Sequence, residues 1–195
     1  MNTLEVIRNW VKKDSDILDL GCGKGEILKY LSEKLNTSSL GIEIDQSNIN
    51  NCIQSGLNVV QQNIDKGLDN FKDESFDTVI MSQTIQVLKE PKKALLEVTR
   101  IGRESIVTIP NFGHWSTRIN LLLSGKMPVT SSLPDKWHNT PNIHLCTISD
   151  FELLCEDCSI NIIEKRFFSN AGNENFLTAF LPNIFASTAM YKISK

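Results

Sequence analysis

The chain has 195 residues, 41% of them hydrophobic and 22% charged, which is the composition of one globular domain large enough to bury a full core. Its net charge of −3 and the lack of a long basic run argue against a nucleic-acid substrate held mainly through its phosphates. No apolar stretch approaches the ~18 residues of a membrane span, and the N-terminus lacks the pattern of a signal peptide, so we expect a cytoplasmic protein without a membrane or nucleic-acid partner.

From the N-terminus, the apolar residues alternate between helical and strand-like spacing through residue 109. Such alternation predicts a mostly parallel sheet with helices on both faces, joined by right-handed crossovers. The expected strands are 16–20, 39–43, 57–60, 75–82 and 104–109, and the expected helices are 4–11, 26–35, 47–55 and 91–100.

Residues 110–148 interrupt this alternation with a stretch rich in Pro, Asn, Trp and His. A segment of this length between core elements is usually functional or disordered, and its aromatic residues argue against disorder. We expect it to be an insertion in a single domain that spans residues 1–195, and to cover the ligand crevice.

After the insertion, Ser149 is expected to cap a helix, and Glu152 three residues later completes the pattern of a capping box. Two strands, 161–168 and 186–193, follow with no clear helix between them. They are expected to form an antiparallel pair at one edge. The predicted architecture is therefore α/β, a mostly parallel seven-stranded sheet with an antiparallel edge strand and helices on both faces.

The five cysteines do not predict a disulfide framework, because their number is odd and the chain has no export signal. Cys155 and Cys158 have the spacing of half a zinc or redox site. The second half is missing, and the pair lies within a helical pattern of apolar residues. We therefore interpret both as buried or half-buried structural side chains and expect no metal site.

The run Leu18-Asp-Leu-Gly-Cys-Gly-Lys-Gly leaves a strand and opens a helix, which is where a ligand-binding glycine turn belongs. Gly21, Gly23 and Gly25 allow a sharp bend and a close approach of the backbone to a ligand. The spacing G-x-G-x-G differs from the dinucleotide pattern G-x-G-x-x-G, and no P-loop lysine and hydroxyl follow. An NAD-dependent oxidoreductase is therefore strongly disfavoured.

Several polar residues follow strands whose carboxyl ends meet at the same edge of the sheet, where open α/β sheets bind ligands. Glu43, at the end of the second strand, is placed to accept hydrogen bonds from both hydroxyls of a ribose. Asp19, Asn63 and Ser82 lie near the ends of other strands. The acidic Asp19 repels a pyrophosphate and suits an ammonium group. These features together predict S-adenosylmethionine (SAM) as the ligand.

The runs Asp19-Leu-Gly-Cys-Gly-Lys-Gly, Gly41-Ile-Glu-Ile-Asp and Ser75-Phe-Asp-Thr-Val-Ile-Met-Ser-Gln resemble the ordered motifs of class I SAM-dependent methyltransferases. Four further runs are similar to the methionine-biosynthesis MetW family and are more specific than the glycine turn. They are Ser82-Gln-Thr-Ile-Gln, Pro110-Asn-Phe-Gly-His-Trp, Leu121-Leu-Leu-Ser-Gly-Lys-Met-Pro-Val-Thr and Asn139-Thr-Pro-Asn-Ile-His-Leu-Cys-Thr-Ile. The resemblance extends to about residue 168 and implies a Rossmann-like class I methyltransferase fold.

The resemblance also implies how this chain would hold SAM. Asp19 and the glycine turn would hold the methionine part, Glu43 the ribose, and the backbone near Ser82 would close the pocket. The family position at Asn63 is commonly Asp, so Asp65 is an alternative contact. The implied cofactor-binding residues are Asp19, Gly21, Cys22, Gly23, Gly25, Glu43, Ile44, Asn63, Ile64 and Ser82.

All three histidines lie in the insertion, and His114 is the best candidate for a catalytic base. A structural histidine that hydrogen-bonds the insertion is the favoured alternative. Trp115 and Trp137 could wall an acceptor pocket, anchor the insertion, or form a partner surface.

Two functions follow from the resemblance. The first is a SAM-dependent methyltransferase of methionine biosynthesis that acts on an unknown acceptor. The alternative is a non-catalytic SAM-binding partner that activates or regulates a homoserine O-acyltransferase.

Overall fold

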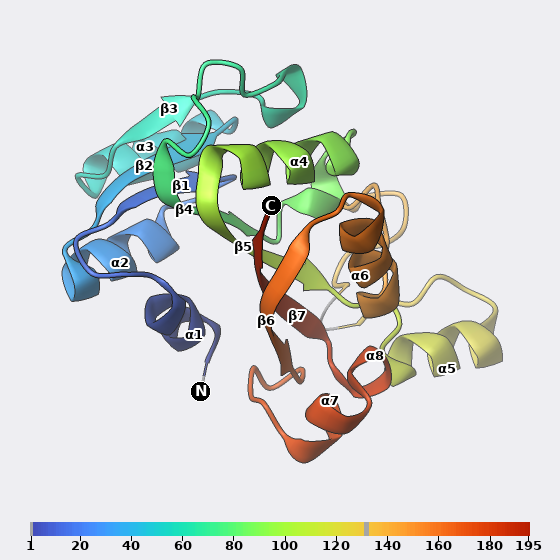
Figure 1. Cartoon of the computed structure of the whole chain (residues 1–195). Helices are drawn as coiled ribbons and strands as arrows, with labels where there is room; N and C mark the ends of the chain where they lie inside the picture. Colours follow the sequence, from blue (N-terminus) through green and yellow to red (C-terminus); the bar gives the residue numbers. More distant parts are fainter. Residues whose placement is uncertain (1, 131–132) are drawn as a thin grey trace.

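The computed structural model describes residues 2–130 and 133–195. At its centre is one seven-stranded sheet in the order β3-β2-β1-β4-β5-β7-β6 (Figure 1). β7 runs antiparallel to both of its neighbours, and the other neighbouring pairs are parallel. The strands are β1 (Asp16–Leu20), β2 (Ser38–Glu43), β3 (Val59–Gln61), β4 (Phe76–Ser82), β5 (Gly102–Pro110), β6 (Asn161–Phe168) and β7 (Thr188–Ser194).

Helices connect the strands and cover both faces of the sheet (Figure 1). They are α1 (Thr3–Trp10), α2 (Glu26–Leu35), α3 (Gln46–Gln54), α4 (Pro91–Ile101), α5 (Trp115–Ser124), α6 (Ile148–Asp157), α7 (Phe176–Phe180) and α8 (Pro182–Phe185), with 3-10 turns η1 (Ile64–Lys66) and η2 (Ile85–Val87). No helix within the described residues has the length and apolarity to cross a bilayer.

The core forms two layers because side chains alternate across the central strands. On β4, Ile80 packs toward α1, α2 and α3, whereas its neighbours Val79 and Met81 pack toward α4 and α6. On β1, Ile17 and Leu18 divide in the same way. These strands are apolar on both faces, as expected of a parallel sheet covered by helices on both sides.

The predicted fold class is confirmed: the sheet has seven strands, most of them parallel, with helices on both faces. β6 and β7 form the expected antiparallel pair at one edge, with β6 outermost and β7 between it and β5. The short helices α7 and α8 between them were not expected. With five and four residues, they are too short to show a helical period.

The expected start of α6 at Ser149 is wrong. Thr147 caps the helix by accepting a hydrogen bond from the Asp150 backbone, and the Asp150 carboxylate accepts one from the Thr147 N–H at 2.8 Å. The Ser149 hydroxyl instead accepts from the Asn183 side chain in α8. Both residues fit a capping box in the sequence, but Glu152, the expected partner of Ser149, instead accepts a hydrogen bond from Lys165.

Cys155 is buried within α6 and Cys158 is half-buried at its end, and both are free thiols, as interpreted from the sequence. Burial raises the pKa of the Cys155 thiol to about 12, which keeps it protonated. Across residues 2–130 and 133–195, no group of three or more His, Cys, Asp or Glu is arranged to hold a metal ion.

Candidate functional site

A cavity of about 340 Å³ opens where the sheet order reverses between β1 and β4, at the carboxyl ends of the strands. This switch point is where open α/β sheets bind ligands. Two carboxylates and no cationic side chain occur among the described residues that line the cavity. The lining residues are Gly21, Ile42, Glu43, Ile44, Gln62, Asn63, Ile64, Asp65, Gln83, Thr84, Val87 and Leu88.

The glycine turn after β1 forms one wall of this cavity. Gly21 has a φ of 77°, and a Cβ added there would lie 2.5 Å from the Thr84 hydroxyl oxygen. Gly23 has a φ of 55°, and the space beside its Cα is open. Both residues adopt the left-handed backbone conformation, which glycine tolerates and other residues rarely adopt. Gly21 brings the turn against the segment after β4, and Gly23 leaves room for a ligand.

Glu43, at the end of β2, ties this turn to the cavity wall. Its Oε2 accepts a hydrogen bond from the Gly23 N–H at 2.8 Å. Its Oε1 accepts from the backbone N–H groups of Ile44 at 2.7 Å and Asp45 at 2.9 Å. A carboxylate offers about four acceptor positions, so a single position remains for a ligand. The expected bidentate contact with both ribose hydroxyls requires one backbone bond to give way.

Asp19, on β1 behind the turn, is a buried carboxylate without a partner. Its exposed fraction is 1%, and neither Oδ atom has a hydrogen-bond partner. Burial, and secondarily the charge of Glu43, raise the pKa of Asp19 to about 7. An unpaired buried carboxylate is costly, so this group is suited to a cationic ligand atom close to the glycine turn.

The opposite wall comes from the segments after β2 and β3. Ile44, a large apolar residue that lines the cavity, is 59% exposed. The Asn63 side-chain oxygen caps η1 by accepting from the Asp65 N–H at 2.9 Å. The Asp65 carboxylate in turn accepts from the Lys89 N–H. Asn63 and the alternative contact Asp65 therefore both also hold the backbone of this wall.

The third wall follows β4. The Ser82 hydroxyl is hydrogen-bonded to that of Thr108 and does not line the cavity. Gln83 does line it, with a left-handed φ of 53° that two hydrogen bonds from its N–H to Thr108 support. Such a conformation is costly for a residue other than glycine and is often found at functional sites. Thr84 packs against Gly21 and donates to the Ser82 carbonyl.

Two predicted binding residues lie behind the turn and not on the cavity surface. The Cys22 sulfur packs into the core against Gly41 and Leu28, so a ligand contact would come from its main chain. Gly25, with a φ of 79°, caps α2 and packs against Leu57. Five of the ten predicted residues line the cavity, namely Gly21, Glu43, Ile44, Asn63 and Ile64. Gly23 is hydrogen-bonded to one of them, Glu43.

His114 does not line the cavity. It is 4% exposed and caps α5, with its Nδ1 accepting from the Ser116 N–H and lying 2.7 Å from the Ser116 hydroxyl. Burial lowers the pKa of His114, which favours the neutral ring. Trp115 and Trp137 also lie outside the cavity and are 46% and 73% exposed. The tryptophans are therefore not buried anchors of the insertion.

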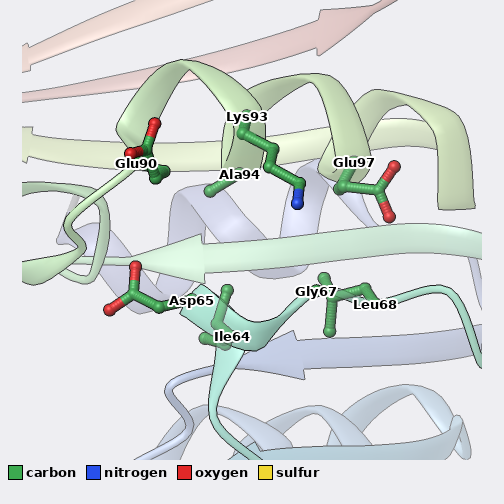
Figure 2. Close-up of a pocket in the computed structure, with 8 residues that line it drawn as sticks. All are labelled: Ile64, Asp65, Gly67, Leu68, Glu90, Lys93, Ala94 and Glu97. Atoms are coloured by element: carbon green, nitrogen blue, oxygen red, sulfur yellow. The ribbon is translucent and has the colours of Figure 1, made fainter.

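A second hollow lies between α4 and η1, where Asp65 and Glu90 are at one end and Glu97 at the other (Figure 2). Its volume is about 10 Å³, which is no more than the space of one water molecule. It is a gap in packing and not a second ligand site.

Six lining residues were not predicted from the sequence: Ile42, Gln62, Gln83, Thr84, Val87 and Leu88. Gln83 and Thr84 do belong to the run Ser82-Gln-Thr-Ile-Gln, so a signal was present in the sequence. Gln62, Val87 and Leu88 have no distinctive pattern, and their position depends on how the loops after β3 and β4 close.

Comparison with known sequences identifies a family and a relative that both match along the chain. The family described as "Methionine biosynthesis protein MetW" matches residues 2–193. A bifunctional methionine biosynthesis protein MetXA/MetW from Rhodopirellula baltica is 30% identical over 195 residues. That alignment covers 95% of this chain and 31% of the relative, so the chain spans about a third of the relative's length.

Comparison with solved structures shows the fold. A SAM-dependent methyltransferase from Mesorhizobium loti has a TM-score of 0.70 at 13% identity, covering 98% of this chain and 96% of that one. A possible histamine N-methyltransferase from Thermotoga maritima has a TM-score of 0.67 at 17% identity, covering 98% and 86%. The [4+2]-cyclase SpnF has a TM-score of 0.69 at 14% identity, covering 98% and 80%. Because a cyclase shares the fold, the fold alone does not define the reaction.

Proposed function

Since the chain belongs to the MetW family of methionine biosynthesis proteins, with the fold of class I SAM-dependent methyltransferases, we propose that it binds SAM and regulates a homoserine O-acyltransferase. The SAM site is the 340 Å³ cavity at the switch point. The partner is proposed because one relative, by its name, unites MetXA and MetW in a single bifunctional protein.

The observation that carries the SAM assignment is the charge around the cavity. Glu43 and Asp65 line it, no cationic side chain does so among the described residues, and Asp19 lies unpaired behind the glycine turn. SAM carries a sulfonium and an ammonium group and no phosphate. A dinucleotide would bring its pyrophosphate to these carboxylates without a counter-charge, which again disfavours an NAD-dependent oxidoreductase.

The residues present fit the parts of SAM. Asp19 would compensate the ammonium group, and the acceptor position left on Glu43 would take a ribose hydroxyl. The exposed Ile44 side chain offers an apolar surface to the adenine, with Asn63 and Ile64 along its edge. The open space at Gly23 admits the ligand close to the backbone.

We favour regulation over catalysis because His114, the candidate base, lies away from the cavity. His114 is buried, faces its own helix and is outside the cavity. The two lining carboxylates are engaged by backbone N–H groups. The second candidate function is methyl transfer to an unknown acceptor, favoured by the methyltransferase fold and by the fact that this displacement depends mainly on positioning.

The test combines binding and activity. The purified chain is titrated with SAM and, for comparison, with NAD by calorimetry. The homoserine O-acyltransferase of the same organism is then assayed alone, with the chain, and with the chain plus SAM, while release of S-adenosylhomocysteine is followed. We expect SAM binding without NAD binding, and acyltransferase activity that depends on the chain and responds to SAM. NAD binding in place of SAM, or acyltransferase activity indifferent to the chain, would overturn the proposal.

A further inference from the structure

The helix α5 turns its apolar side toward solvent. Trp115, Ile119 and Leu122 follow the spacing of one helical face, and Leu123 adjoins them. Leu122 and Leu123 are 81% and 80% exposed, whereas the helix buries Thr117. A helix of a monomeric protein normally directs its apolar stripe to the core, and contiguous exposed apolar patches mark interaction sites. We call these four residues the α5 face.

The α5 face is held in place by the rest of the fold. His114 caps the helix at its start, and Gly125 ends it in a left-handed conformation. The Arg118 side chain donates to the carbonyls of Gly113 and Asn183, the second of which belongs to α8. α5 therefore lies beside α8 on the outside of the molecule (Figure 1). A surface formed in advance costs less conformational entropy when a partner binds.

The segment that follows α5 extends this surface. Met127, Val129 and Trp137 are exposed and line a hollow of about 420 Å³, together with Lys126 and Lys136. Between residues 111 and 147 there are three Lys or Arg and one Asp or Glu, although the whole chain has a net charge of −3. The surface is therefore both apolar and basic. Two copies placed face to face would bring cations together, so an acidic partner fits better.

The far end of the same segment is bonded to the wall of the ligand cavity. The backbone N–H groups of Ile143 and His144 both donate to the Gln86 carbonyl at 3.0 Å. Gln86 belongs to η2, and the next residue, Val87, lines the cavity. A protein bound along this segment would thus contact a stretch of chain that is hydrogen-bonded to one wall of the cavity.

We propose that the α5 face, extended by Met127, Val129 and Trp137, is the surface on which the homoserine O-acyltransferase docks. This inference rests on the proposed function, which supplies the partner. The matching surface on the acyltransferase is an apolar recess bordered by Asp and Glu. Trp and Met are typical anchors of such interfaces.

The test uses the full chain and the purified acyltransferase of the same organism, with affinity measured by calorimetry and mass by sedimentation. The double variant Leu122→Glu/Leu123→Glu places two charges on the α5 face. The control Leu153→Glu alters a leucine on α6 that is 57% exposed. We expect the double variant to bind the acyltransferase at least tenfold more weakly, and the control to bind within twofold of wild type. The thermal shift caused by SAM should be retained in both, because neither position lines the cavity.

A charge-reversal variant, Lys126→Glu/Lys136→Glu, tests the same surface without touching α5, and we expect at least a tenfold loss. Equal binding by wild type and both double variants would overturn the docking surface and leave the partnership intact. A wild-type chain that does not bind the acyltransferase at all would instead overturn the partnership itself. A wild-type dimer that the leucine variant dissociates, with acyltransferase binding unchanged, would assign the α5 face to a second copy and overturn the inference.

Discussion

The backbone N–H of Gly23 donates a 2.8 Å hydrogen bond to Oε2 of Glu43, so one carboxylate joins the glycine turn after β1 to the end of β2. The same carboxylate accepts two further backbone bonds at the start of the next loop. Glu43 therefore shapes the cavity before any ligand arrives, in addition to the ribose contact expected from the sequence.

Replacing Glu43 by Ala should weaken both the fold and SAM binding. Three backbone N–H groups lose their acceptor, which should lower the free energy of unfolding by about 1–3 kcal/mol. SAM affinity, measured by calorimetry well below the unfolding temperature, should fall at least tenfold. Glu33→Ala, at an exposed position on α2, is the matched control. An affinity within about twofold of wild type would show that Glu43 does not shape or contact the SAM site.

Gly21→Ala should be more damaging than Gly56→Ala, although both glycines have a φ above 70°. At Gly56 the added Cβ meets open space, so the cost is conformational, on the order of 1 kcal/mol. At Gly21 the Cβ also overlaps Thr84, which should add about 1–3 kcal/mol. Urea unfolding of both variants measures this difference. Equal losses would mean that Thr84 moves away freely and that the close approach of Gly21 to Thr84 does not matter for stability.

Stability should depend on pH through Asp19. Its pKa is about 7 in the folded protein and near 3.8 in a solvated chain, so the folded state retains a proton that the unfolded state releases. The free energy of unfolding therefore falls as pH rises from about 4 to about 7 and then levels. Asp19→Asn removes this dependence. Its stability advantage over wild type should grow between pH 5 and pH 8, by roughly 2–3 kcal/mol.

Urea unfolding at several pH values checks this, with Asp157→Asn at an exposed position as the control. Parallel stability profiles for wild type and Asp19→Asn across this range would contradict a buried, unpaired carboxyl group.

SAM binding should show the opposite dependence on pH. A cationic ligand favours the ionised form of Asp19, so binding releases a proton while the pH is below about 7. Affinity should fall by up to about tenfold per pH unit below that value. Asp19→Asn should bind SAM more weakly and with little pH dependence between pH 5.5 and 7.5. Calorimetry in buffers of different ionisation enthalpy measures the released proton directly, and finding none in wild type would remove Asp19 from the site.

His114→Ala should lower stability without changing SAM affinity. The variant loses the side chain that caps α5, which should cost about 1 kcal/mol. His114→Asn retains a capping oxygen and should recover most of the loss. If both variants instead lost any detected methyl transfer while binding SAM normally, His114 would be the catalytic base.

The central sheet and the position of the cavity could be predicted from the sequence because local signals coincide there. The apolar runs of β1 and β4, the glycines and Glu43 each specify a feature that the fold preserves. A structural His114 that hydrogen-bonds the insertion was favoured from the sequence, but its place at the cap of α5 could not be predicted, nor could the cap that Asn63 forms, because a cap depends on the backbone that it meets. The exposure of the apolar face of α5 could not be predicted either, since apolar residues at helical spacing normally indicate a buried face.

The position of β7 in the sheet affects how the chain folds while it is being synthesised. It follows β6 in the sequence and yet lies between β5 and β6 in the sheet. While the ribosome is still adding residues before position 188, the outer edge of β5 has no strand to pair with and β6 has no place to attach. Such open edges invite aggregation. Premature termination in that interval should therefore yield an insoluble product, even though the cavity-forming strands β1 to β4 have already been synthesised.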